Sequence, residues 1–168
     1  MKTLFNKYMD YKNKYLKYKQ KYMNIKNKKV AFDFDGVLHL SVNDPESSGQ
    51  VHPIEKIRNN AKKLKPNNYI IKKIYEYYED GYTVFIITHR PSSEINTVND
   101  FCKIHGLNEI IAPHNRLFAQ GNKGDLMKHH NIKILFDDSA NVLENVKSKY
   151  PDFKLYHIYN KKGKYNLF

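Results

Sequence analysis

The sequence predicts an α/β protein in which helices cover both faces of a mainly parallel β-sheet. From residue 29 onward, short apolar segments alternate with segments of helical periodicity, which is typical of parallel strands joined by crossover helices. Polar residues close most of the apolar segments, and α/β proteins carry their ligand sites at such strand ends. We therefore expect one three-layer domain with a sheet of about five strands.

Residues 1–29 precede this alternation and differ from it in composition. They hold ten Lys and one acidic residue, Asp10, so they contribute +9 of the formal net charge of +12 and leave +3 for the rest. Large apolar residues recur at steps of four and three, which predicts a basic helix with one apolar seam. The seam consists of Leu4, Tyr8, Tyr11, Tyr15, Tyr18, Tyr22 and Ile25.

Three interpretations of this basic helix are open. The first is a solvated helix that packs loosely on the domain. The second is a surface for self-association along the seam, and the third is a positively charged segment that binds an anionic partner such as nucleic acid. Because the rest of the chain is nearly neutral, the charge does not indicate that the whole domain binds nucleic acid.

The domain itself is expected to cover residues 30–160. Its strands are predicted at residues 30–34, 83–87, 109–112, 132–136 and 153–159. Its helices are predicted near residues 68–79, 92–105, 123–130 and 141–149. Residues 161–168 form a basic tail, which we expect to be an untethered chain end.

Composition excludes several classes of protein. No segment approaches the ~20 apolar residues of a membrane span, and the start lacks the apolar centre of a secretory signal. The one cysteine, Cys102, cannot form an internal disulfide, and its apolar neighbours indicate a buried thiol. We expect a cytoplasmic location. The abundance of Lys, Asn, Ile and Tyr is similar to that of giant DNA virus proteins, for which the location would be the host cytoplasm or the virion.

Polar residues end the predicted strands at the edge where a ligand would bind. Two acids end the first strand, a threonine ends the second, a pair of acids ends the fourth, and a lysine opens the helix before that fourth strand. Because the carboxyl ends of parallel strands share one edge of the sheet, we expect these side chains to converge. They are Asp33, Asp35, Thr88, Asp137, Asp138 and Lys123.

Converging carboxylates repel one another, and a hard divalent cation would relieve that repulsion. Mg²⁺ is the favoured ion, because it prefers oxygen ligands and leaves coordination positions for a phosphate oxygen. Zinc is disfavoured, since the adjacent His129 and His130 have no second pair of ligands at a suitable spacing.

A carboxylate near such a cation can attack phosphorus and form an acyl-phosphate that water then cleaves. We assign Asp33 as the nucleophile. We assign Asp35 as the acid that protonates the leaving oxygen and later takes a proton from water. Thr88 would donate a hydrogen bond to the transferred phosphoryl group, and Lys123 would supply positive charge to it.

Four segments carry these residues: Asp33-Phe34-Asp35-Gly36-Val37-Leu38, Ile86-Ile87-Thr88, Asn122-Lys123-Gly124 and Phe136-Asp137-Asp138-Ser139. In order, spacing and strand placement they resemble the four motifs of the haloacid-dehalogenase superfamily, over residues 29–159. The resemblance implies the Rossmann-like fold of that superfamily. It also implies a Mg²⁺ bound by the carboxylates of Asp33 and of one of Asp137 and Asp138, and by the backbone carbonyl of Asp35. The acid at Asp35 indicates a phosphatase, since the dehalogenases of the superfamily lack it.

The sequence says less about the substrate. Members of the superfamily often carry a cap domain, but only a flap fits between residues 36 and 53, and the chain between Thr88 and Lys123 is also short. Residues 54–79 are predicted to be helical and could cover part of the site. An open site of this kind resembles that of phosphatases acting on macromolecules. His39, His89 and Arg90 follow the motifs directly and are candidates for substrate contact or for loop packing.

Three functions follow. The first is a magnesium-dependent phosphomonoester hydrolase acting on a nucleotide or nucleic-acid end phosphate, which the Lys-rich segment favours because Lys binds phosphates without base specificity. The second is a phosphatase of proteins or small metabolites. The third belongs to another class: a non-catalytic interaction module that assembles through residues 1–29.

Overall fold

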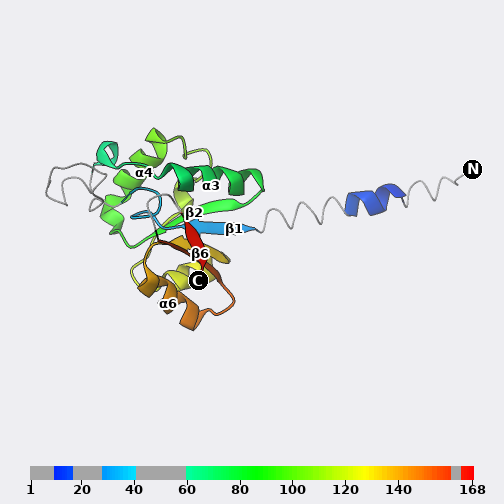
Figure 1. The fold of residues 1–168 in the computed structure, drawn as a ribbon. Helices are drawn as coiled ribbons and strands as arrows, with labels where there is room; N and C mark the ends of the chain where they lie inside the picture. The colour runs from blue at the N-terminus through cyan, green and yellow to red at the C-terminus, as the bar shows by residue number, and fades with distance from the viewer. Residues whose placement is uncertain (1–9, 17–27, 41–59, 160–163) are drawn as a thin grey trace, which may run out of the picture.

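The computed structural model describes residues 10–16, 28–40, 60–159 and 164–168 (Figure 1). Its centre is a six-stranded sheet in the order β3-β2-β1-β4-β5-β6, in which β1 to β5 are parallel and β6 is antiparallel to β5. The strands are β1 (Lys29–Phe32), β2 (Thr83–Thr88), β3 (Arg116–Phe118), β4 (Ile134–Asp137), β5 (Lys154–Ile158) and β6 (Tyr165–Leu167). The helices are η1 (Ala61–Lys63), α3 (Asn68–Glu79), η2 (Ser92–Glu94), α4 (Ile95–Ile104), η3 (Pro113–Asn115), α5 (Lys123–His129) and α6 (Ala140–Lys149).

The strand order confirms the predicted α/β class with a mainly parallel sheet, and it is a Rossmann-like order. The chain runs from β1 to β2 and β3 on one side, and then returns to β4 and β5 on the other side. The strand order therefore reverses between β1 and β4. Ligands of open α/β sheets bind at the carboxyl ends of the strands that flank such a reversal.

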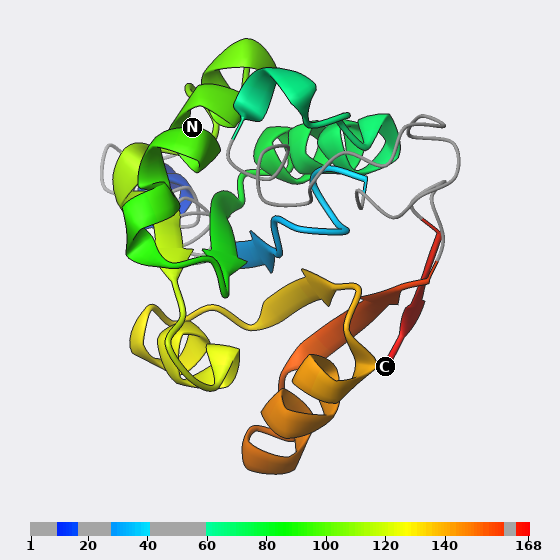
Figure 2. The ribbon, with the colours of Figure 1, turned by 90° about the vertical axis from the view of Figure 1, so that its left-hand side faces the viewer.

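Helices lie on both faces of the sheet (Figure 2). Two buried apolar layers pack between the sheet and these helices. In β1, Val30 and Phe32 pack with α3 and α4 on one face, whereas Ala31 packs with α5 and α6 on the other. Residues 84–87 of β2 are all buried and alternate between the same two layers. A strand buried on both faces has a continuous apolar sequence, which is why these central strands could be predicted.

The predicted helices are confirmed with small changes at their ends. The helix at residues 68–79 has the predicted bounds, and α5 and α6 each differ by one residue from the prediction. The segment at residues 92–105 is divided into η2 and α4, with Pro91 immediately before the 3-10 turn. Proline is tolerated at a helix start because the amide that it lacks would have no partner within the helix.

The strand predicted at residues 109–112 is wrong. The amides of Ile110 and Ile111 both donate to the carbonyl of Leu107, at 3.1 and 2.8 Å, so this segment is a turn. Both isoleucines are buried, and the apolar run therefore contributes to the core without forming a strand. The strand of this region is instead β3, which pairs with residues 86–88 of β2. Periodicity alone does not distinguish a short apolar turn from a short buried strand.

The chain end belongs to the sheet and is not the untethered tail that we expected. Residues 165–167 pair with β5 as an antiparallel sixth strand. The ring of Tyr165 lies 5.1 Å from the ring of Phe136 and 5.4 Å from that of Tyr156. These contacts anchor a strand of three residues, which is too short to show a periodic pattern of its own.

Part of the basic segment can be compared with the prediction. Residues 10–16 are helical, as expected, and Tyr11 and Tyr15 of the seam are exposed. The other residues of the seam lie outside the described part of the chain. Self-association and binding to an anionic partner therefore stay predictions.

The segment between the first motif and α3 also lies partly outside the described residues. The flap expected between residues 36 and 53 is described only as far as residue 40. In the segment expected to be helical at residues 54–79, η1 is followed by an irregular stretch around Pro66, and α3 begins at Asn68. Proline disfavours helical backbone in the residue before it, which explains this interruption.

Cys102 is buried on α4, as predicted. Burial raises the pKa of the Cys102 thiol to about 11, although the charge of Arg116 opposes this rise. The thiol therefore remains protonated at neutral pH. Within the described residues, none of the helices combines the length and apolar character needed to cross a membrane.

We predict that Tyr165→Ala lowers the free energy of unfolding by about 2 kcal/mol, because it removes a packed ring from the core. Leu167→Ala is the matched control on the same strand, since Leu167 is 68% exposed. Its effect should stay within about 0.5 kcal/mol. Chemical denaturation followed by circular dichroism measures both. Equal stabilities of the two variants would contradict the placement of β6 in the sheet.

Candidate functional site

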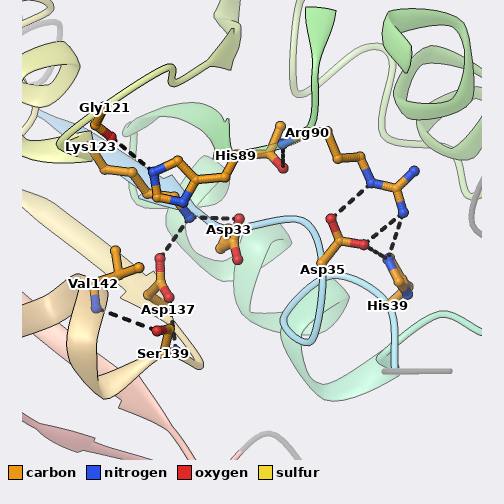
Figure 3. Close-up of polar contacts among 11 residues, drawn as sticks. Asp33, Asp35, His39, His89, Arg90, Gly121, Lys123, Asp137, Ser139 and Val142 are labelled. Atoms are coloured by element: carbon orange, nitrogen blue, oxygen red, sulfur yellow. Dashed lines mark hydrogen bonds and ion pairs between the residues drawn. The ribbon is translucent and has the colours of Figure 1, made fainter. Parts of the chain in front are cut away.

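The predicted site residues lie at the carboxyl ends of the two central strands and their neighbour (Figure 3). Thr88 is the last residue of β2, Asp137 is the last residue of β4, and Asp33 directly follows β1. The amide of Asp33 donates to the carbonyl of Phe136 at 2.8 Å, which continues the pairing of β1 with β4 beyond the strand end. Asp33, Thr88 and Asp137 therefore lie at the same edge of the sheet, as the strand ends predicted.

Lys123 connects two of the carboxylates. Its Nζ lies 2.7 Å from Oδ1 of Asp33 and 2.7 Å from Oδ2 of Asp137, and all three side chains are buried. Burial lowers the pKa of Lys123, but the charges of Asp33 and Asp137 outweigh it and raise that pKa above its ordinary value. The ammonium group therefore stays protonated at neutral pH.

Asp138 adds a third carboxylate to this group. One oxygen of each of Asp33, Asp137 and Asp138 lies within 4.8 Å of the others. Burial raises the pKa of Asp33 to about 7. The charge of Lys123 opposes this rise, and the charge of Asp137 adds to it. Desolvation and the charge of Asp137 raise the pKa of Asp138 to about 6, although this residue keeps an exposed face.

The charges of this group fit a divalent cation. Three ionised carboxylates and one ammonium group leave a net charge of −2, which one Mg²⁺ would neutralise. All the available donors are carboxylate oxygens, the ligand type that Mg²⁺ prefers. The raised pKa values of Asp33 and Asp138 have the same two causes, which are burial and, after it, the negative charge of Asp137.

The loop after β4 is held by its own polar groups. The amide of Ser139 donates to Oδ1 of Asp137 at 2.9 Å, and the hydroxyl of Ser139 accepts from the amide of Val142 at 3.4 Å as the N-cap of α6. On the other side, Nε2 of His157 donates to the carbonyl of Asp138 at 3.0 Å. These contacts fix Asp137 and Asp138 relative to β4 and β5.

Gly36 is required by the proximity of Asp138. Its φ is 75°, in the left-handed region that glycine adopts without strain. A Cβ atom at this position would also overlap the carboxylate of Asp138. The glycine after the two aspartates of the first motif thus allows the β1 loop to approach the β4 loop.

Each residue of the segment 122–124 has a separate role at the start of α5. The side chain of Asn122 accepts from the amide of Gly124 at 2.8 Å as the N-cap, and it donates to the carbonyl of Asn145 at 2.9 Å. A Cβ atom on Gly124 would overlap the ring of Tyr150. The helix start is therefore fixed between its cap and α6, and this places Lys123 between the carboxylates.

Asp35 belongs to a second charged group on the same loop. Its Oδ2 accepts from Nε of Arg90 at 2.8 Å and its Oδ1 from Nη2 at 2.6 Å. Nε2 of His39 lies 2.9 Å from the same Oδ1. Burial would raise the pKa of Asp35, but the hydrogen bonds to His39 and Arg90 outweigh it and hold that pKa below its ordinary value.

The three residues predicted to contact substrate lie in different settings. His39 and Arg90 are buried and both interact with Asp35, so neither side chain presents an exposed surface to a ligand. His89 is exposed and donates from Nε2 to the carbonyl of Gly121 at 2.9 Å, near Lys123 (Figure 3). The hydroxyl oxygen of Thr88 accepts from the amide of Arg90 at 3.1 Å. Among the three, His89 is thus the one that a ligand could reach.

One participant in the site was missed from the sequence. Glu94 accepts from Nη1 of Arg90 at 3.0 Å, so the guanidinium group lies between two carboxylates. The spacing of four residues between Arg90 and Glu94 is a signal for an ion pair on a helical turn. Its significance depends on the burial of Arg90, which the sequence did not indicate.

A scan against protein-family models found no match. A search of curated proteins found an uncharacterized protein of Acanthamoeba polyphaga mimivirus that is 36% identical over 116 residues. The match covers 67% of this chain but 22% of the viral protein, so this chain spans about a fifth of the length of that relative. The viral relative agrees with the giant-virus composition of the sequence, and its name assigns no activity.

We predict that Gly36→Ala weakens Mg²⁺ binding and lowers the free energy of unfolding by roughly 1–2 kcal/mol or more, because the left-handed backbone becomes strained and Asp138 must move. Gly121→Ala is the control, since no heavy atom lies within 4 Å of its added Cβ. Isothermal titration with Mg²⁺ and thermal unfolding compare the two. Native-like Mg²⁺ affinity in Gly36→Ala would argue against the close approach of the two loops.

The raised pKa of Asp33 predicts a pH-dependent stability. Without metal, the folded chain binds this proton more readily than the unfolded chain, whose carboxyl has a pKa near 3.8, so stability falls as pH rises toward about 7. Between pH of about 5 and about 8 in chelator, native protein should lose more stability than Asp33→Asn, which cannot ionise. Parallel thermal unfolding profiles would contradict this prediction.

Mg²⁺ should reverse that loss for the native protein. At about 100-fold its dissociation constant it would raise the free energy of unfolding by about 2.7 kcal/mol. The gain should be larger at the higher pH, since protons compete with the cation for the carboxylates.

Proposed function

We propose that this protein is a magnesium-dependent phosphatase of the haloacid-dehalogenase type, which acts through an aspartyl-phosphate on Asp33. The observation that carries the proposal is the buried group of Asp33, Asp137 and Lys123, with Asp138 beside it, at the strand-order reversal. Three of the four short segments that resemble the motifs of that superfamily supply these residues. The Rossmann-like strand order is compatible with such a protein.

Asp33 and one or both of Asp137 and Asp138 would hold the cation, together with the backbone carbonyl of Asp35. When bound, Mg²⁺ would reduce the repulsion between the carboxylates and the phosphate and would stabilise charge on the phosphoryl oxygens. Lys123 would contribute positive charge to the same oxygens, and its two carboxylate partners keep it protonated. Thr88, at the end of β2, would donate its hydroxyl hydrogen to a phosphoryl oxygen.

The reaction would proceed in two displacements at phosphorus. In the first, a carboxylate oxygen of Asp33 forms a bond to phosphorus while the bond to the leaving oxygen breaks, and Asp35 gives that oxygen a proton. In the second, water attacks phosphorus, Asp35 takes a proton from the water, and inorganic phosphate leaves Asp33. Asp35 must therefore carry a proton before the first step and be ionised before the second. Its contacts with Arg90 and His39 favour the ionised form, the state that the second step requires.

We further propose a nucleotide or nucleic-acid end phosphate as the substrate. The formal charge of +12 favours a polyanion, with most of it in residues 1–29. Between β2 and β4 the described chain holds η2, α4, η3, β3 and α5, all of which belong to the domain, so this segment contains no separate cap. A site without a cap from this segment would admit the end of a large substrate.

We predict that Asp33→Asn lowers phosphate release by at least about 1000-fold, as expected for loss of a nucleophile. Release is measured with an aryl phosphate, nucleotides, 3′- and 5′-phosphorylated oligonucleotides and a phosphopeptide, with and without Mg²⁺. Asp152→Asn is the control, since Asp152 is an exposed aspartate of a distant loop. Circular dichroism establishes that each variant is folded.

The outcomes of this panel separate the candidate functions. Activity that requires both Mg²⁺ and Asp33 and is highest on oligonucleotides or nucleotides is the expected result. Highest activity on the phosphopeptide would instead assign the chain to protein phosphatases. Folded native protein that hydrolyses none of the substrates would contradict the proposal and favour a non-catalytic interaction module.

A further inference from the structure

Arg90 is a buried cation between two carboxylates. Its side chain has no exposed surface, and it donates to Asp35 through Nε and Nη2 and to Glu94 through Nη1. The guanidinium carbon lies 4.8 Å above the centroid of the Phe34 ring. Phe34 lies between Asp33 and Asp35 in the sequence. Its ring therefore supports Arg90, which in turn binds Asp35.

The contacts with Asp35 fix its orientation. A carboxylate has about four lone-pair positions on its two oxygens. Oδ1 accepts from Nη2 of Arg90 and lies within hydrogen-bond distance of Nε2 of His39, whereas Oδ2 accepts from Nε of Arg90. Two parallel bonds from one guanidinium group define the plane of the carboxylate as well as its position. A position on Oδ2 remains for a further partner.

Burial differs sharply within this group. The side chain of Asp35 is 37% exposed, whereas that of His39 is 2% exposed and that of Arg90 is fully buried. An incoming ligand would therefore meet Asp35 and would find Arg90 and His39 behind it. This arrangement argues against our expectation that Arg90 and His39 contact substrate directly.

We propose that Arg90 is a positioning residue that acts through Asp35. This inference rests on the proposed function. By fixing the carboxylate of Asp35 from behind, Arg90 determines how well Asp35 protonates the leaving oxygen, and hence how well the protein hydrolyses esters of weakly acidic alcohols. A lysine in its place would supply charge but not the two parallel hydrogen bonds.

The test compares two phosphate monoesters that carry the same phosphoryl group. 4-Nitrophenyl phosphate has a leaving group that departs without protonation, whereas an alkyl phosphate such as a nucleoside 5′-monophosphate requires a proton from the acid. The readout is the ratio of kcat/KM for the two substrates, because kcat/KM covers the first displacement, in which the leaving group departs. A change in this ratio reports leaving-group protonation, whereas general damage to the fold or to the binding of the phosphoryl group lowers both values together.

Asp35→Asn should lower kcat/KM for the alkyl ester about 100-fold more than for the aryl ester, the contribution typical of a general acid. Arg90→Gln should shift the ratio in the same direction, and Arg90→Lys should recover part of it. The double variant Asp35→Asn with Arg90→Gln should have the ratio of Asp35→Asn alone, because Arg90 acts through that carboxylate. Asp152→Asn is the control, since Asp152 is an exposed aspartate outside the site, and it should leave the ratio unchanged.

Equal loss on both esters in Arg90→Gln, or a gain on the alkyl ester, would overturn the inference. Thermal unfolding establishes whether each variant is folded. If Arg90→Gln does not fold, Arg90→Lys decides the question, and an unchanged ratio in that variant overturns the inference. Native protein with no Mg²⁺-dependent activity on either ester would contradict the proposed function itself, whereas active native protein with an unchanged ratio would contradict the role of Arg90 alone.

Discussion

The buried ammonium group of Lys123 between Asp33 and Asp137 is the interaction on which the rest of the site depends. Burial of an isolated charge costs several kcal/mol per ion, so these three side chains are tolerated only together. The fold meets this requirement by pairing β1 with β4, which brings Asp33 and Asp137 to one edge, and by starting α5 at Lys123. Gly36 and Gly124 then permit the close approach of the loops that carry them.

A second charged group stands beside the first without sharing side chains with it. Lys123 binds Asp33 and Asp137, whereas Arg90 binds Asp35 and Glu94. The two aspartates differ in pKa: burial raises that of Asp33, whereas for Asp35 the hydrogen bonds to His39 and Arg90 outweigh burial and lower it. Divergent environments for paired acids are a feature of sites in which one carboxylate attacks and the other transfers protons.

The sequence predicted the parts of the fold that depend on local patterns. Continuous apolar runs identified β1 and β2, helical periodicity gave the bounds of α3, and polar residues at strand ends identified Asp33 and Lys123 as neighbours. It did not predict features that depend on tertiary contact. Residues 109–112 are buried as a turn, and β6 is too short for a pattern and depends on the rings around Tyr165. Likewise, the sequence left open whether Arg90 contacts substrate or packs in its loop, and its burial against Phe34 and Asp35 depends on tertiary contact.

The central claim is that Asp33 carries phosphate during turnover, and borohydride trapping tests it most directly. Borohydride reduces an acyl-phosphate to the alcohol, so a phosphorylated aspartate is converted to homoserine and is located by peptide mass analysis. Native protein quenched during turnover with Mg²⁺ and its best substrate should contain homoserine at position 33, and omission of Mg²⁺ should abolish it. Phosphate release without homoserine at position 33, or with homoserine at another aspartate, would contradict the mechanism.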